Sequence, residues 1–254
     1  MERQLIGWAL DLDGVIWRGT ETVPGSPEAV ARLRAAEVPI AFVTNSAQRT
    51  PAQVAAKLAS HGIDDAEHEV ITAAMAAATL VAPGERVLTI GSDGLVQALE
   101  TVGAEIVDRG PADTVAVGID LTFDYDAMSR AMRAIQDGAR FIATNTDATF
   151  PTADGLVPGN GALVAAVSTA SGVVPQVAGK PHEPIAALVR DRLGPDGVMV
   201  GDRPETDGLF AEAVGYGFGL VFSGVTVPAD LPVEPTPAYI AADLAAMVDM
   251  VLTS

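Results

Sequence analysis

Short apolar runs alternate with longer amphipathic segments along most of the chain. Two of these runs, Leu5–Leu10 and Pro39–Val43, have the length and composition of buried strands. The segment between them predicts a helix that begins at Ser26, a favourable N-cap, with Pro27 as its first helical residue, and that ends near Ala36. Because strands and helices take turns, the pattern is typical of a parallel sheet that is covered by helices on both faces.

The same alternation continues to the end of the sequence. It predicts further strands at Arg86–Ile90, Thr114–Ile119, Arg140–Thr144, Gly197–Val200 and Gly219–Phe222. It predicts further helices between Thr50 and Gly62 and at Asp93–Val102, Tyr125–Gln136, about Gly161–Ala170, Pro184–Leu193, Glu205–Val214 and Asp243–Leu252. The middle of the chain forms a repeating α/β segment of roughly 90 residues, which is large enough to be a domain.

Polar side chains gather where the predicted strands of the first and last thirds end. Ligands of open parallel sheets bind beyond the carboxyl ends of the strands, so these side chains are candidates for one site. A lysine between glycine and proline, just before a late helix, is the candidate cation. The candidates are Asp11, Asp13, Thr44, Asn45, Lys180, Asp202 and Asp207.

The residue types in this set indicate metal and phosphate chemistry. Clustered carboxylates in a chain without cysteine favour a hard cation with oxygen ligands, of which Mg²⁺ is the most plausible. The net charge of −18 argues against nucleic acid as a partner, and it would repel an anionic substrate unless a metal and Lys180 offset it. Asp11 would then lie near an electrophilic phosphorus, and Asp13, on the same side of the extended chain, would transfer protons.

Four motifs in this order resemble the haloacid-dehalogenase superfamily of phosphatases. They are DLDGVIWRG from residue 11, TNSAQRT from residue 44, GKP from residue 179 and GDRPETD from residue 201. The segment ATNTDATFPTADGLVPGNGALVAA, residues 143–166, is similar to the large α/β cap of the NagD-like branch. That branch includes nitrophenylphosphatases, phosphoglycolate phosphatases and pyridoxal phosphate phosphatase. The resemblance implies a Rossmann-like catalytic core at 1–80 and 177–254, with a cap for substrate specificity inserted at 81–176.

The resemblance also implies roles for the four aspartates. Asp11 would be the nucleophile that forms an aspartyl phosphate, and Asp13 would be the general acid and base. Asp11 and Asp202 would ligate Mg²⁺, together with the backbone carbonyl of Asp13. Asp207 would support the metal site and orient Lys180.

Two further groups of residues would contact the substrate. Thr44, Asn45 and Lys180 would bind the transferring phosphoryl group. The polar loop Asn145–Pro151 of the cap is the expected specificity element. Its candidate residues are Asn145, Asp147 and Phe150.

A few residues have no assigned function. Pro204 and Gly208 stand where the family usually has leucine and isoleucine, and the glycine should weaken its helix by up to about 1 kcal/mol. We expect His182 at a helix start on the surface, and His61, at a helix end, in solvent. Trp17 either faces the substrate or packs under the cap.

The expected function is Mg²⁺-dependent hydrolysis of a small phosphorylated metabolite, and several alternatives stay open. A mutase of the same superfamily would pass the phosphoryl group to a sugar, but such enzymes usually carry a small helical cap. Receiver domains also hold an aspartyl phosphate, yet they are about half as long. A non-catalytic phosphate-binding protein is the third alternative.

The sequence also bears on location and assembly. No apolar run reaches the roughly 18–20 residues of a membrane span, and the first residues do not resemble a signal peptide. We therefore expect a cytoplasmic protein without a membrane partner. Caps of the resembled branch can pair, which makes a homodimer an expectation of that resemblance.

Overall fold

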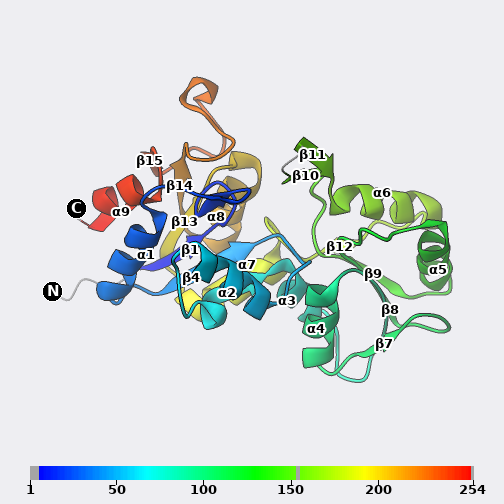
Figure 1. Cartoon of the computed structure of the whole chain (residues 1–254). Helices are drawn as coiled ribbons and strands as arrows, with labels where there is room; N and C mark the ends of the chain where they lie inside the picture. The colour runs from blue at the N-terminus through cyan, green and yellow to red at the C-terminus, as the bar shows by residue number, and fades with distance from the viewer. Residues whose placement is uncertain (1–5, 153–154, 253–254) are drawn as a thin grey trace. The chain divides into compact units, whose positions relative to one another are not determined.

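The computed structural model describes residues 6–152 and 155–252, which form two compact units, each with a parallel sheet (Figure 1). The first unit comprises the described parts of residues 1–44, 53–71 and 180–254, and the second comprises those of 45–52 and 72–179. The second unit thus begins before residue 81, the predicted start of the cap, because helix α3 (Ala73–Ala78) packs against helix α4 (Asp93–Thr101). That this unit acts as a cap stays a prediction.

The sheet of the first unit has six strands. Their spatial order is β15 (Tyr239–Ala241), β14 (Gly217–Val221), β13 (Gly197–Gly201), β1 (Gly7–Leu10), β4 (Ile40–Thr44) and β5 (Val70–Thr72). Strand β1 lies inside the sheet and pairs in parallel with both β13 and β4. Its carboxyl end therefore lies beside those of its two neighbours, at the edge of the sheet where ligands of open parallel sheets bind.

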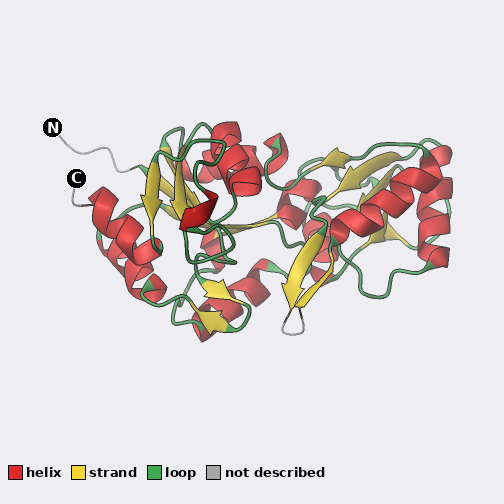
Figure 2. Cartoon of the chain, turned by 90° about the horizontal axis from the view of Figure 1, so that it is seen from above, coloured by secondary structure: helices red, strands yellow, loops and turns green. Residues whose placement is uncertain are grey.

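Helices cover both faces of this sheet (Figure 2). Side chains at alternate strand positions, such as Trp8, Leu10 and Phe42, are fully buried in one cluster with Leu33 and Met247. Leu33 belongs to α1 (Ser26–Ala35) and Met247 to α9 (Leu244–Leu252), two helices that pack against each other. On the other face, α7 (Glu183–Leu193) packs against β1 and β4, and α8 (Leu209–Val214) packs against α7. The fold class predicted from the sequence, an α/β protein with a parallel sheet, is confirmed.

The second unit repeats the same construction with other strands. Its sheet has the order β12 (Gln176–Val177), β9 (Arg140–Ala143), β8 (Thr114–Val117), β6 (Arg86–Ile90) and β7 (Glu105–Val107), and all four pairings are parallel. Helices α5 (Tyr125–Gln136) and α6 (Asn160–Ser171) pack together over a core that includes Ile90, Val117 and Val164. The amphipathic helix α2 (Pro51–Ser60) begins in the short stretch of 45–52 that belongs to this unit and continues in the first unit.

Two local expectations are wrong. Ser26 is not an N-cap but the first residue of α1, and its buried hydroxyl donates to the carbonyl of Val15 at 2.7 Å. Gly25, whose φ of 81° suits glycine, precedes it as the cap residue. The loop predicted at Asn145–Pro151 runs into a hairpin in which β10 (Thr149–Thr152) pairs antiparallel with β11 (Gly155–Pro158).

Candidate active site

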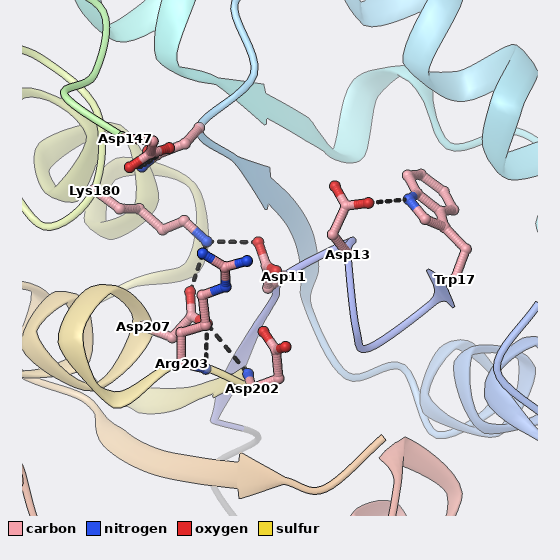
Figure 3. Close-up of polar contacts among 9 residues, drawn as sticks. Asp11, Asp13, Trp17, Asp147, Lys180, Asp202, Arg203 and Asp207 are labelled. Carbon is pink, nitrogen blue, oxygen red and sulfur yellow. Dashed lines mark hydrogen bonds and ion pairs between the residues drawn. The ribbon is translucent and has the colours of Figure 1, made fainter. Parts of the chain in front are cut away.

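Asp11 is held at the carboxyl end of β1 by its backbone, since its N–H donates to the carbonyl of Val200 in β13 at 2.9 Å. The chain then turns sharply, and the carbonyl of Leu12 accepts from the N–H groups of Ile16 and Trp17 at 2.9 and 3.2 Å. Gly14 takes a φ of 84° in this turn, a conformation that side-chain-bearing residues rarely adopt. The turn separates the two acids, because the side chains of Asp11 and Asp13 point to different neighbours (Figure 3).

Lys180 lies between two carboxylates. Its Nζ donates to Asp11 at 2.6 Å and to Asp207 at 2.7 Å, and its side chain is only 3% exposed. Burial lowers the pKa of this lysine, but the two neighbouring carboxylates more than offset that effect and the pKa is raised. Burial raises the pKa of Asp11 well above its usual range, although the Lys180 ammonium opposes the shift. The arrangement is a buried cation shared by two acids, and burying these charges carries a desolvation penalty.

Asp202 and Asp207 are positioned by the segment that follows β13. One carboxylate oxygen of Asp207 accepts from the backbone N–H groups of Asp202 and Arg203, each at 3.2 Å, within a π-helical turn over Pro204–Gly208. One oxygen of Asp202 accepts from the N–H of Val225 at 2.6 Å.

Three glycines leave room for these two carboxylates. A Cβ atom at Gly201 would lie 2.3 Å from the side chain of Asp207. Cβ atoms at Gly14 and Gly224 would lie 2.5 and 1.9 Å from a carboxylate oxygen of Asp202. Each of these glycines therefore lets a backbone segment approach an acid closely.

The carboxylates fit a hard divalent cation. Asp11, Asp202 and Asp207 can each offer one oxygen, and these oxygens lie within 4.8 Å of one another. Carboxylate oxygens are the ligands that Mg²⁺ and Ca²⁺ take in proteins. The group includes Asp207, which was expected only to support the metal site. Asp13 was expected to contribute a backbone carbonyl, and that contribution stays a prediction.

The electrostatics of Asp202 predict how stability depends on pH. Burial and the nearby Asp207 raise its pKa from 3.8 to about 6. The folded state therefore binds more protons than the unfolded state between pH 4 and 6, so the free energy of unfolding falls as the pH rises through this window. In the absence of metal, we expect the free energy of unfolding of the wild type to fall by up to about 3 kcal/mol relative to that of Asp202→Asn as the pH rises through this window. Urea unfolding of both proteins at several pH values measures the difference, and a constant difference from pH 4 to 7 would contradict the prediction.

The predicted phosphate-binding residues fall into two groups. Thr44 is buried at the end of β4, and Lys180 is in the cluster just described, both in the first unit. Asn45 belongs by its contacts to the second unit, where its amide donates to the Asp147 carboxylate at 3.2 Å. Its carbonyl accepts from the amide of Asn145 at 2.8 Å.

The cap candidates are organised by a residue that the sequence analysis missed. Buried Asn160 donates to the carbonyl of Asn145 at 2.8 Å and to the hydroxyl of Thr144 at 3.2 Å, and so fixes the loop that carries Asp147. The third candidate, Phe150, lies on β10 and is half-buried. The signal for Asn160 was its place between Gly159 and Gly161. At these positions a Cβ would come within 2.3–2.4 Å of the carbonyls of Asp147 and Thr146 respectively.

Two independent family models match the two ends of the chain. A model described as haloacid dehalogenase-like hydrolase matches residues 8–105, and a second HAD-hydrolase-like model matches residues 177–247. A 5′-nucleotidase of Bacillus subtilis, YutF, is 40% identical over 226 residues, which cover 87% of this chain and 88% of the relative. The chain belongs to the haloacid dehalogenase-like hydrolases. Within this family it is also 36% identical to an acid sugar phosphatase of Staphylococcus epidermidis over 91% of both chains.

Solved structures of this family agree with the fold of the chain. A p-nitrophenyl phosphatase from Archaeoglobus fulgidus matches with a TM-score of 0.90 and 34% identity, covering 96% of this chain and 98% of the other. A glycerol phosphate phosphatase from Mycobacterium tuberculosis, in complex with calcium, matches with a TM-score of 0.89 and 36% identity, covering 94% and 74%. The resemblance to HAD phosphatases of the NagD-like branch and the Rossmann-like core are confirmed.

The departures from the HAD motif have partial structural explanations. A Cβ atom at Gly208 would lie 2.9 Å from Cδ of Pro235 and 3.1 Å from the ring of Phe218, so glycine suits this close packing. Pro204 is buried at the start of the π-helical turn, where nothing in the structure explains the choice of proline. His182 is exposed at the N-cap of α7. His61, expected in solvent, is buried, and its Nδ1 lies 2.7 Å from the hydroxyl of Thr22.

Proposed function

We propose that this HAD phosphatase hydrolyses a small phosphomonoester with the help of a divalent cation and through an aspartyl phosphate on Asp11. One observation carries the proposal: buried Lys180 joins Asp11 and Asp207, and the carboxylate of Asp202 lies within 4.8 Å of those two acids. Lys180 and a metal ion held by the carboxylates would supply the positive charge that binds a phosphate group.

In the first half-reaction an oxygen of Asp11 attacks phosphorus. The bond between phosphorus and the leaving oxygen breaks, and Asp13 supplies the proton that the leaving oxygen takes. The Lys180 ammonium lowers the pKa of Asp11 against the larger effect of burial, and it neutralises part of the phosphoryl charge. Thr44, at the end of the neighbouring strand, offers a hydroxyl to the same phosphoryl group.

In the second half-reaction a water molecule attacks the aspartyl phosphate. Asp13 takes a proton from that water, the bond between phosphorus and Asp11 breaks, and inorganic phosphate leaves with the Asp11 carboxylate and the protonated Asp13 restored. Asp11 and Asp202, with Asp207 beside them, would hold the metal, which when bound neutralises the carboxylates and the developing charge on the phosphoryl oxygens. Arg203, half-buried next to Asp202, adds a second positive charge to the site.

The metal and the substrate class rest on the family and on the donor set. Mg²⁺ suits the oxygen ligands, and the M. tuberculosis glycerol phosphate phosphatase has been crystallised with both magnesium and calcium. The relatives are phosphatases of nucleotides, sugars and glycerol phosphate, so the substrate we propose is a small phosphorylated metabolite. In the part of the chain that the structure describes, no helix has the length and apolarity needed to cross a bilayer.

Metal dependence is the first test of the proposal. The purified protein should release phosphate from members of a panel that contains sugar phosphates, glycerol phosphate, nucleoside 5′-monophosphates, phosphoglycolate, pyridoxal phosphate and p-nitrophenyl phosphate. We expect EDTA to lower kcat/KM by on the order of 10²-fold or more, because the carboxylates then repel the substrate, and added Mg²⁺ to restore it. Full activity in EDTA would contradict the metal assignment.

Other outcomes of this experiment would favour the alternatives. Transfer of the phosphoryl group to a sugar in place of release as phosphate would indicate a mutase. A phosphorylated protein that is stable for minutes, without turnover, would indicate a receiver-like protein. Binding of inorganic phosphate without phosphate release or phosphorylation would indicate a phosphate-binding protein without catalysis.

A further inference from the structure

Asp13, the proposed general acid and base, has a hydrogen-bond partner to which no role has yet been given. The indole Nε1–H of Trp17 donates to Oδ1 of Asp13 at 2.9 Å, and Figure 3 shows the Asp13 carboxylate turned toward this ring. Asp13 is exposed, whereas Trp17 is only 2% exposed. A buried, rigid side chain thus holds the acid whose orientation matters most for proton transfer.

The backbone fixes the spacing of this pair. In the turn between them the N–H of Gly14 donates to the carbonyl of Trp17 at 2.7 Å, and the N–H of Trp17 donates to the carbonyl of Leu12 at 3.2 Å. The intervening Val15 and Ile16 are fully buried. Trp17 therefore reaches Asp13 from a short segment that has little freedom to move.

Two neighbours contact the indole ring itself, and a third holds one of them in place. Lys57 of α2 places its Nζ 3.8 Å from the centroid of the ring, a cation–π contact. His61 stacks on the ring with a centroid separation of 5.0 Å and an interplanar angle of 27°. Thr22, the strand partner of Trp17, binds the His61 ring through its hydroxyl. The ring is held from α2 and from its own hairpin, so it can act as a fixed donor.

We propose that Trp17 is a positioning residue for proton transfer by Asp13, an inference that rests on the proposed function. Because the indole N–H occupies Oδ1, Oδ2 is the oxygen that carries the proton to the leaving group and later accepts one from water. The hydrogen bond also prevents free rotation of an exposed carboxylate, which would otherwise spend part of its time in unproductive orientations.

A second tryptophan supplies a matched control. Trp8 lies in β1 and is fully buried, and its indole nitrogen has no hydrogen-bond partner among the described residues. The chain has only these two tryptophans. Trp17→Phe and Trp8→Phe each remove one indole N–H and keep an aromatic ring, but only the first removes a hydrogen bond to Asp13.

Leaving-group dependence separates positioning from packing. An alkyl phosphate such as glycerol phosphate needs the proton of Asp13, whereas p-nitrophenolate leaves without much help. For Trp17→Phe we expect kcat/KM, which reports the steps up to departure of the leaving group, to fall by on the order of 10-fold on the alkyl ester and to change little on p-nitrophenyl phosphate. Hydrolysis of the aspartyl phosphate is common to both esters, so a kcat limited by that step should fall on both. Trp8→Phe should affect both esters equally. In an Asp13→Asn background, Trp17→Phe should add no further loss.

An equal loss of kcat/KM on both esters, or no loss of kcat/KM on either, would overturn the proposal. A measurement without turnover keeps it testable if Trp17→Phe folds poorly or the wild type hydrolyses no ester of the panel. The two indole N–H groups give two signals in a ¹H–¹⁵N spectrum. Asp13→Ala should shift the Trp17 signal upfield and speed its exchange with solvent, while the Trp8 signal stays in place; an unmoved Trp17 signal would refute the contact. Failure of the proposed function shows separately, as absence of phosphate release by the wild type.

Discussion

Asp11→Asn should abolish phosphate release, with a loss of on the order of 10⁴-fold or more in kcat, and leave the fold intact. The amide has the shape of the carboxylate but is a poor nucleophile, so no covalent intermediate forms. The measurement is phosphate release under single-turnover and steady-state conditions with the preferred ester of the panel. Near-full activity of the variant would contradict the covalent mechanism.

The same substitution should cost little stability. The carboxylate of Asp11 is 14% exposed, and burial raises its pKa, so a neutral amide removes an unfavourable charge at the same time as it removes one partner of Lys180. Lys180 keeps its ion pair with Asp207. We therefore expect thermal unfolding within a few degrees of the wild type.

The control should match the chemistry of the change. Asp196→Asn replaces an exposed aspartate in the same unit, outside the site, and should leave kcat unchanged.

Asp13→Asn tests for the aspartyl phosphate by slowing its hydrolysis. With p-nitrophenyl phosphate, attack by Asp11 should continue while hydrolysis of the aspartyl phosphate slows. This variant should therefore accumulate phosphoenzyme, detectable by intact mass, whereas Asp11→Asn should accumulate none.

Hydrophobic patterning predicted the main strands and helices because each buries several residues of regular spacing. Strand β6, for example, has the predicted bounds Arg86–Ile90, and α5 has the predicted bounds Tyr125–Gln136. The shortest elements were missed, among them β5, β7 and β15. Each of these has only three residues, too few for an alternation to stand out, and is formed because a neighbouring strand offers an edge.

The strand-end rule predicted the charged cluster from residues far apart in the sequence. Asp11, Lys180 and Asp207 do meet, because β1 and β13 are neighbours and the segment before α7 reaches the same edge. The sequence did not show that a carboxylate oxygen of Asp207 lies close enough to Asp11 and Asp202 to ligate a metal. Asp207 lies in a π-helical turn, whereas the sequence predicted an α-helix there.

The contacts of Trp17 could not be predicted from the sequence, for a different reason. Its neighbours Lys57 and His61 lie some forty residues later in the chain, on and just after α2. No local pattern distinguishes a histidine in solvent at a helix end from one that a tertiary contact buries. The position of a ring between a hairpin and a helix depends on packing, which a single sequence does not display.

Lys180→Met should lower both the activity and the stability of the protein. The methionine has a similar length but no charge, so the carboxylates of Asp11 and Asp207 lose the cation that they share at 2.6 and 2.7 Å. Breaking a buried ion pair from one side costs about 3–5 kcal/mol. Without the ammonium, kcat/KM should fall by on the order of 10³-fold, because the charge of the phosphoryl group is no longer neutralised and Asp11 ionises less readily. Urea unfolding and phosphate release measure the two losses.

The pH dependence and a second substitution identify the cause of this instability. Since Lys180 lowers the pKa of Asp11, its removal raises that pKa further, and the variant should be less destabilised at pH 5, where the carboxylates take up protons, than at pH 7.5. Adding Asp11→Asn to Lys180→Met removes one of the two uncompensated charges, so the double variant should be more stable than Lys180→Met alone at pH 7.5. If the double variant were less stable by the sum of both effects, the damage would come from lost packing of the lysine stem. The carboxylates left without a cation would then not be the cause of the instability, and the electrostatic interpretation of this cluster would be wrong.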